Sequence, residues 1–184
     1  MPTYPHPRGP FTVLSSTEKY RNKWINVRED QVTRPDGKPG LFGVVAIQPG
    51  VAIVALDNDH NIYLVETFCY ANNVWLLEVP GGGIDIQESP LAAAQRELAE
   101  ETSLQAQQWQ ELGMYAPLHL ISAPITMFLA DQVTSVALQV EPDGEPIRLV
   151  KLPFAEAVAK VLSGQITDGV SQCAILKAAR YLGR

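Results

Sequence analysis

The segment at residues 81–104, GGGIDIQESPLAAAQRELAEETSL, constrains the fold more than any other part of the chain. Ser89 and Pro90 form a helix start, because serine caps free backbone N–H groups and proline fits the first helical position. The residues that follow are strong helix formers. Their apolar members recur at helical spacing, at Leu91, Ala94 and Leu98. The sequence therefore predicts an amphipathic helix over residues 89–102.

Short β-rich runs surround this helix. Before it, from Trp24 onward, the runs are KWINVREDQVT, LFGVVAIQ, VAIVALD, NIYLVETF and WLLEVP. After it come the strand-like runs MFLADQVT and IRLVKLP, and then the helical patterns PFAEAVAKVLSG and VSQCAILKAARYLG. Residues 1–10 are expected to form a loose arm. Strands before, between and after helices, without regular alternation, predict a mixed α/β layered fold.

Composition limits the class of protein. A chain of 184 residues, 46% of them hydrophobic, suits one domain with a substantial core and a small appendage. A net charge of −6 disfavours nucleic acids and anionic membranes as partners. Cys69 and Cys173 lack metal-binding spacing, and the polar N-terminus does not resemble a signal peptide. We therefore expect a soluble cytoplasmic protein.

The acidic residues of the predicted helix form one stripe. Glu97 and Glu101 lie one turn apart, and Glu100 borders the same face. Arg96 lies four residues before Glu100 and can orient it by a hydrogen bond. Mg2+ prefers carboxylates, water and phosphate oxygens as ligands, and the preceding PGGG can turn sharply because glycine tolerates positive φ. Spacing alone leaves two interpretations open, a solvated helix face and a Mg2+ site holding a diphosphate.

The complete pattern decides between them by resemblance. Gly82, five residues, Glu88, seven residues and then RELAEETSL resemble the Nudix box, G-x5-E-x7-R-E-U-x-E-E-x-G-U, in which U is aliphatic. Eight of the nine fixed positions match over 23 residues. Ser103 stands where the family has glycine, just past the helix, where a left-handed residue is preferred. Serine there is expected to cost some stability and to remove no ligand.

The resemblance implies a Nudix-type α/β/α sandwich with an N-terminal antiparallel β-sheet arm. It also implies a Mg2+ site, with Mn2+ as a substitute, whose ligands are Gly81, Glu97, Glu100 and Glu101. Arg96 would orient the carboxylates as part of the catalytic machinery, and Glu100 is a candidate base. Gly82 and Glu88 would support the site.

Beyond the box, residues 11–184 resemble the ADP-ribose pyrophosphatase branch, whose members cleave nucleoside diphosphate sugars. This implies an arm over residues 1–45, which commonly helps to form a homodimer, and a Nudix domain over residues 46–184. The implied reaction is Mg2+-dependent hydrolysis of a nucleoside diphosphate sugar, with ADP-ribose leading, to AMP and ribose 5-phosphate.

Residues outside the box are candidates for contacting the substrate. We expect Arg28, Tyr70 and Glu78 to bind it. Tyr70, Trp75 and Trp24 could stack on a nucleobase or pack in the core. On a late loop, VEPDGEPIRL, the candidate base is Glu145, with Asp143 and Glu141 as alternatives.

Two departures from the branch concern the substrate. Cys69 stands where many relatives have a phosphate-binding arginine, and the proline that marks ADP-ribose enzymes would fall on His119. Three alternatives therefore stay open: another sugar nucleotide such as GDP-mannose, a non-nucleotide diphosphate, and a non-catalytic Nudix-fold module that binds such a ligand.

Overall fold

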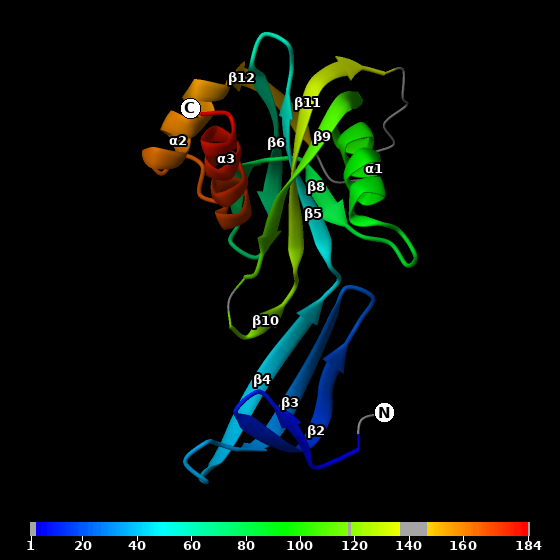
Figure 1. Cartoon of the computed structure of the whole chain (residues 1–184), viewed down its shortest axis with the longest axis vertical. Helices are drawn as coiled ribbons and strands as arrows, with labels where there is room; N and C mark the ends of the chain where they lie inside the picture. The colour runs from blue at the N-terminus through cyan, green and yellow to red at the C-terminus, as the bar shows by residue number, and fades with distance from the viewer. Residues whose placement is uncertain (1–2, 118, 137–146, 184) are drawn as a thin grey trace. The chain divides into compact units, whose positions relative to one another are not determined.

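The computed structural model describes residues 3–117, 119–136 and 147–183 (Figure 1). The chain divides into two compact units. One comprises Met1–Gln48 and Ala116–Pro124, and is called the N-terminal unit below. The other comprises Pro49–Tyr115 and Ile125–Arg184, and is called the main unit.

The N-terminal unit is a five-stranded sheet in the order β1-β2-β3-β4-β10. Its strands are β1 (His6–Arg8), β2 (Phe11–Arg21), β3 (Ile25–Thr33), β4 (Pro39–Ile47) and β10 (Ile121–Ser122). β1 to β4 pair antiparallel with their neighbours, which confirms the predicted antiparallel sheet, and β10 pairs parallel with β4. The prediction of a loose arm over residues 1–10 is wrong for His6–Arg8. Gly9, with φ of 57°, reverses the chain so that β1 pairs with β2.

The main unit holds a seven-stranded sheet whose central order is β12-β6-β5-β11-β9. β7 pairs with β6, and β8 pairs with β5. The strands are β5 (Gly50–Leu56), β6 (Asn61–Cys69), β7 (Val74–Glu78), β8 (Gly81–Gly83), β9 (Leu104–Tyr115), β11 (Ile125–Ser135) and β12 (Arg148–Pro153). The helices are α1 (Pro90–Thr102), α2 (Phe154–Leu162) and α3 (Gly169–Tyr181).

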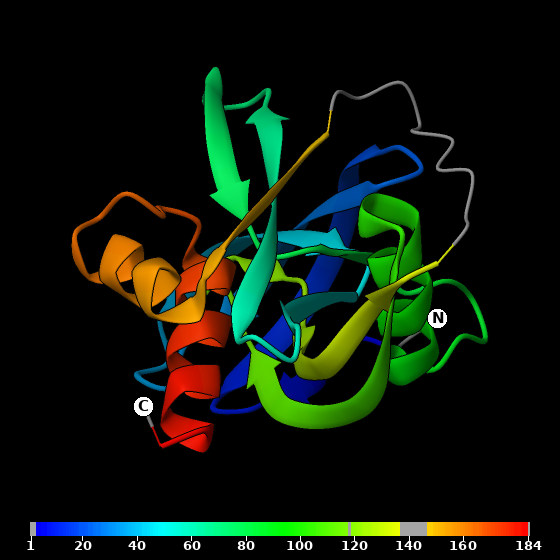
Figure 2. The same ribbon diagram turned by 90° about the horizontal axis from the view of Figure 1, so that it is seen from above.

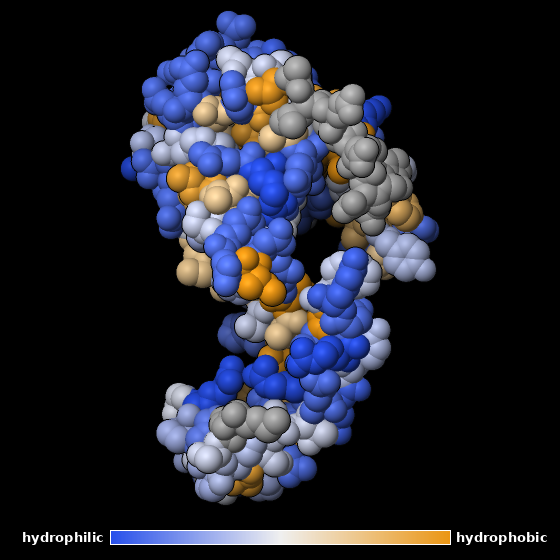
Figure 3. Space-filling view, turned by 90° about the vertical axis from the view of Figure 1, so that its right-hand side faces the viewer, coloured by the Kyte–Doolittle hydropathy of each residue, from blue (hydrophilic) through white to orange (hydrophobic). Residues whose placement is uncertain are grey.

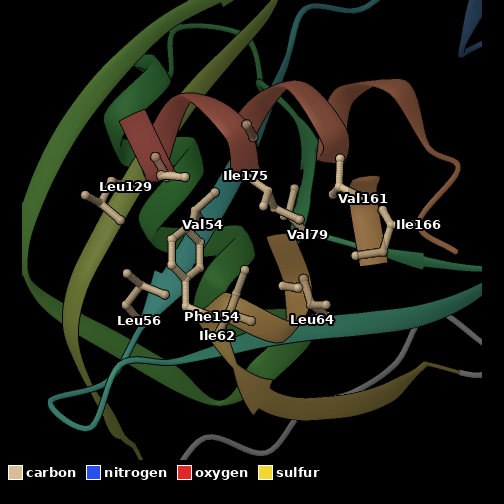
Figure 4. Packing of buried hydrophobic residues seen from close by; sticks show 14 of the residues in the cluster. Val54, Leu56, Ile62, Leu64, Val79, Leu129, Phe154, Val161, Ile166 and Ile175 are labelled. Carbon is tan, nitrogen blue, oxygen red and sulfur yellow. The ribbon is translucent and has the colours of Figure 1, made fainter. Parts of the chain in front are cut away.

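The central strand β5 is buried on both faces, and its side chains alternate between two cores. Val51, Ile53 and Ala55 pack in a cluster with Leu98 of α1. Ala52, Val54 and Leu56 pack in the second cluster, with residues of α2 and α3 (Figure 4). Figure 2 shows α1 on one side of this sheet and α2 and α3 on the other. The predicted α/β/α sandwich is confirmed.

The surface contrasts with these cores. On the face shown in Figure 3, apolar residues reach the surface in several separate patches among hydrophilic residues. In the described part of the chain, no helix combines the length and the apolar character that crossing a membrane would need.

Helix α1 begins and ends where its sequence signals lie. The side chain of Ser89 accepts a hydrogen bond from the backbone N–H of Ala92 at 3.1 Å, and Pro90 is the first helical residue. The helix stops at Ser103, which adopts the left-handed conformation with φ of 54°. Its N–H donates to the carbonyl of Ala99 at 2.9 Å. Serine thus occupies the conformation in which glycine is favoured.

We expect Ser103→Gly to stabilise the protein. Serine in the left-handed region costs about 1–2 kcal/mol, and the extra freedom of glycine in the unfolded chain offsets part of the gain. The free energy of unfolding, measured by urea denaturation, should rise by about 0.5–1 kcal/mol. Ser163→Gly is the control, because Ser163 ends α2 with an ordinary negative φ. An equal gain in both variants would contradict this explanation.

The turn between β5 and β6 is organised by a buried carboxylate. Asp57 is only 8% exposed, and its oxygens accept hydrogen bonds from the backbone N–H of Asp59 at 3.0 Å and of Asn61 at 2.8 Å. Nζ of Lys151 on β12 lies 2.7 Å from Asp57 Oδ2. Burial alone would raise the pKa of Asp57, but the bonds from Lys151 and Asn61 outweigh it and hold the pKa at about 2. Ionised Asp57 therefore ties β12 to this turn.

Asp57→Asn should destabilise the protein at neutral pH and have little effect in acid. The pKa of Asp57 is lower in the folded than in the unfolded state, so its contribution is present at neutral pH and disappears between about pH 4 and pH 2. We expect a loss of about 2 kcal/mol at pH 7 that shrinks as the pH falls below about 4, measured by urea denaturation. Asp36→Asn is the control, because Asp36 is exposed and lies 3.4 Å from Lys38. A loss that stays constant down to pH about 3 would contradict the linkage.

Candidate active site

The three glycines before α1 form a strand. Gly81–Gly83 is β8, which pairs with β5 in the register Val51↔Gly82 and Ala52↔Gly81. The predicted sharp turn is wrong, because within the described chain positive φ at glycine occurs at Gly9, Gly37, Gly113, Gly164 and Gly183. Glycine is needed here because other atoms lie too close for a side chain. A Cβ on Gly81 would lie 2.2 Å from the carbonyl oxygen of Val51, and one on Gly82 would lie 2.3 Å from the carboxyl carbon of Glu97.

Arg96 organises the outer part of the acidic stripe. Its Nε and Nη2 each donate to one oxygen of Glu88 at 3.0 Å, a two-point ion pair. Its Nη1 donates to Glu97 Oε1 at 2.8 Å and to Glu100 Oε2 at 3.0 Å. Nη2 also donates to the carbonyl of Gly83 at 2.8 Å. The predicted bond from Arg96 to Glu100 is therefore present, and the same guanidinium fixes three carboxylates against β8.

Glu101 forms the inner end of the stripe. Its Oε2 accepts the backbone N–H of Gly81 at 2.9 Å. Burial raises its pKa to about 7; the Gly81 N–H opposes that rise, while Glu97, Glu78 and Glu100 add to it by repulsion. Burial also raises the pKa of Glu97, against the effect of Arg96. Two partly buried carboxylates one turn apart thus repel each other, an arrangement that a cation would stabilise.

The oxygen atoms gathered here are suitable ligands for a hard divalent cation. Glu97, Glu101 and the backbone of Gly81 offer oxygen ligands, which Mg2+ prefers. In the described part of the chain, no three His, Cys, Asp or Glu side chains are already arranged to hold a metal ion. Oxygens of Glu97 and Glu100 instead form ion pairs with Arg96. The residues fit a cation once those carboxylate oxygens turn to it.

Glu78 lies at the end of β7, three residues before Gly81. Its Oε2 accepts a hydrogen bond from Thr67 Oγ1 on β6 at 2.8 Å. Burial raises the pKa of Glu78; the Thr67 bond opposes this rise, and the charge of Asp168 adds to it. Since Glu78 also acts on Glu101 electrostatically, the structure brings this predicted substrate-binding residue to the acidic stripe.

The other predicted substrate residues belong to other elements. Tyr70 is 90% exposed in the turn between β6 and β7, and Trp75 and Trp24 are also largely exposed, so none of the three packs in a core. Arg28 belongs to β3 of the N-terminal unit, where its Nε donates to both oxygens of the buried Asp30 at 3.2 Å. Cys69 ends β6 opposite Val74. Glu145, with its alternatives Asp143 and Glu141, lies outside the described residues.

Sequence reasoning missed Ser171 in the first turn of α3. Its Oγ accepts the backbone N–H of Val79 at 3.0 Å, within the segment that leads to Gly81. The two residues are 92 positions apart, so no local pattern could have indicated the contact. Thr67 on β6 was missed too, because a single threonine outside the box belongs to no recognisable sequence pattern.

Sequence comparison places both units in known families. Residues 11–45 match the nucleoside diphosphate sugar hydrolase N-terminal domain, and residues 46–162 match the NUDIX domain. The chain is 31% identical to the ADP-ribose pyrophosphatase of Mycobacterium tuberculosis over 174 residues, 90% of this chain and 82% of that protein. It is 23% identical to the methanol dehydrogenase activator of Bacillus methanolicus over 167 residues, covering 88% of this chain and 89% of that one.

Among solved structures, an ADP compounds hydrolase matches with a TM-score of 0.83 and 21% identity, over 94% of each chain. That match shows the same fold. The chain belongs to the Nudix hydrolases, in the branch of the ADP-ribose pyrophosphatases. The predicted enzyme class, a Nudix pyrophosphohydrolase, is thereby confirmed.

Proposed function

We propose that the protein hydrolyses the diphosphate bond of a nucleoside diphosphate sugar in a Mg2+-dependent reaction, with ADP-ribose as the leading substrate. The observation that carries the proposal is the pair of partly buried carboxylates Glu97 and Glu101, one helical turn apart beside β8, whose negative charges repel each other. The relative from Mycobacterium tuberculosis, named as an ADP-ribose pyrophosphatase, supports the choice of substrate.

In this proposal Glu97, Glu101, Glu100 and the Gly81 carbonyl hold Mg2+, or Mn2+ in its place. When bound, the ion supplies positive charge for the phosphate oxygens and makes water a better nucleophile. Arg96 and Glu88 keep the carboxylates in place, and Gly82 leaves room for Glu97. Glu100, 59% exposed at its side chain, can accept a proton from the attacking water, a role that Glu145 shares as a candidate. A bond forms from water oxygen to phosphorus, and the bridging P–O bond breaks, giving AMP and ribose 5-phosphate.

Partners and location form part of the same proposal. We propose a homodimer formed through the sheet of residues 1–45, because large apolar side chains of the N-terminal unit are exposed at Leu14, Tyr20, Trp24 and Leu41. Light scattering after size exclusion tests this, and a monomer at all concentrations would contradict it. The net charge of −6 disfavours nucleic-acid and anionic-membrane partners. We propose a cytoplasmic location, because Cys69 and Cys173 are both free thiols.

A substrate panel tests the function directly. ADP-ribose, GDP-mannose and other nucleotide sugars, together with a non-nucleotide diphosphate, are incubated with Mg2+ or with EDTA. Added phosphatase then releases phosphate only from monophosphate products. We expect turnover with Mg2+, none with EDTA, and the highest kcat/KM for ADP-ribose. If no diphosphate is turned over but binding is still measurable by calorimetry, the protein is a non-catalytic ligand-binding module and the proposed enzyme activity is wrong.

A further inference from the structure

The four residues Glu78–Gly81 connect the end of β7 to the acidic stripe. At the far end of this segment, the Gly81 N–H donates to Glu101 at 2.9 Å. In its middle, the carbonyl of Pro80 accepts the N–H of Ile53 on β5 at 2.8 Å. The position of Gly81, both as a donor to Glu101 and as a carbonyl ligand, therefore depends on how firmly this segment is held.

Ser171 holds the segment from α3. Its hydroxyl oxygen accepts the Val79 N–H at 3.0 Å, and the residue is only 1% exposed. The place of that hydroxyl is itself fixed, because the Ser171 N–H donates to the carboxylate of Asp168, which caps α3, at 2.7 Å. A buried backbone N–H without an acceptor costs free energy, so the hydrogen bond to Ser171 holds Val79 in position.

Thr67 holds the segment from β6. Its hydroxyl donates to Glu78 Oε2 at 2.8 Å, across the antiparallel pair that joins β6 to β7. The partner register, Val65↔Glu78, puts Thr67 diagonally opposite Glu78, which suits a side-chain bond. Thus two hydroxyls from outside the Nudix box, one on β6 and one on α3, bind consecutive residues, Glu78 and Val79.

We propose that Ser171 and Thr67 are positioning residues for the cation and diphosphate site, acting through Glu78–Gly81 on the contact between Gly81 and Glu101. The inference rests on the proposed function. Outer residues that orient the ligands of a metal site contribute about 10–100-fold to metal affinity or activity when removed. The hydrogen bonds that the two hydroxyls form in the described residues go to Glu78 and Val79, so we expect each to act through the segment it holds.

The test uses Ser171→Ala, Thr67→Val and Thr67→Ser in the full chain. Thr67→Val keeps the shape and removes the hydroxyl, whereas Thr67→Ser keeps the donor. Val161→Ala is the stability control, because Val161 lies on α2 in the core and outside this segment. Affinity for Mn2+ alone is measured by calorimetry, kcat and KM by substrate hydrolysis, and unfolding by urea.

We expect Ser171→Ala and Thr67→Val to weaken Mn2+ binding about tenfold and to lower kcat more than they raise KM. Thr67→Ser and Val161→Ala should bind Mn2+ like the wild type. Wild-type affinity in both hydroxyl-deleted variants would overturn the inference while leaving the proposed function intact. Equal losses in Val161→Ala would overturn it too, since general destabilisation would then be the cause. A wild-type protein that neither binds Mn2+ nor hydrolyses any diphosphate would overturn both.

Discussion

Replacing Glu101 by glutamine should lower kcat by about 10³-fold while the fold survives. Glu101 is a partly buried carboxylate of the acidic stripe, and the Gly81 N–H donates to one of its oxygens. Glutamine has the same shape, and its amide oxygen can still accept that N–H. What the variant loses is negative charge next to Glu97, and with it the attraction for a divalent cation.

The stability of the variant separates this explanation from misfolding. Burial and repulsion from Glu97 make the ionised Glu101 unfavourable, so a neutral amide should leave the metal-free protein at least as stable as the wild type. Adding Mg2+ should raise the melting temperature of the wild type and not of the variant. Glu111→Gln is the control, because Glu111 lies on β9 and exposes its side chain. Near-normal kcat in Glu101→Gln would remove Glu101 from the cation site.

Helix α1 could be predicted from the sequence because its signals are local. Ser89, Pro90 and the apolar spacing set its start and its buried face, and the observed helix, Pro90–Thr102, lies within the predicted range. The bond from Arg96 to Glu100 follows from the same geometry, since residues four apart share a helix face. The observed left-handed Ser103 also follows, because the matched pattern has glycine there.

Strands with weak patterns and contacts between distant residues could not be predicted. The polar β1 and the glutamine-rich β9 show no regular alternation, so only their partners, β2 and β11, define them as strands. Trp24 and Trp75 were candidates for stacking on a nucleobase or for packing in the core, and both are exposed, Trp24 between β2 and β3 and Trp75 on β7. The contact of Ser171 with Val79 depends on the packing of α3 against the whole sheet.

The physical reason predicted for the glycines before α1, a sharp turn, is wrong. Positive φ is a common reason for glycine in a turn, and the sequence has no feature that distinguishes it from close approach of another group. The structure places Gly82 in a regular strand, paired with Val51, and the Glu97 carboxyl group occupies the space that a Cβ at position 82 would need. Position 82 thus controls where Glu97 lies rather than how the chain turns.

Gly82→Ala should therefore damage the site without unfolding the protein. The new Cβ would lie 2.3 Å from the Glu97 carboxyl carbon, so Glu97 must leave its place, and its bond to Arg96 at 2.8 Å must lengthen or break. Because a misplaced catalytic group commonly costs about 10²-fold, we expect kcat to fall by about that factor and Mn2+ affinity to fall with it.

Gly43→Ala is the matched control for this substitution. Gly43 is also a strand glycine, and a Cβ there meets nothing within 4 Å. Both variants exchange glycine for alanine in a β-strand, so they share the change in chain entropy and differ in the contact with Glu97. If Gly82→Ala keeps the kcat of Gly43→Ala, Glu97 can act from a displaced position, and the fixed pair of Glu97 and Glu101 is not what the reaction requires.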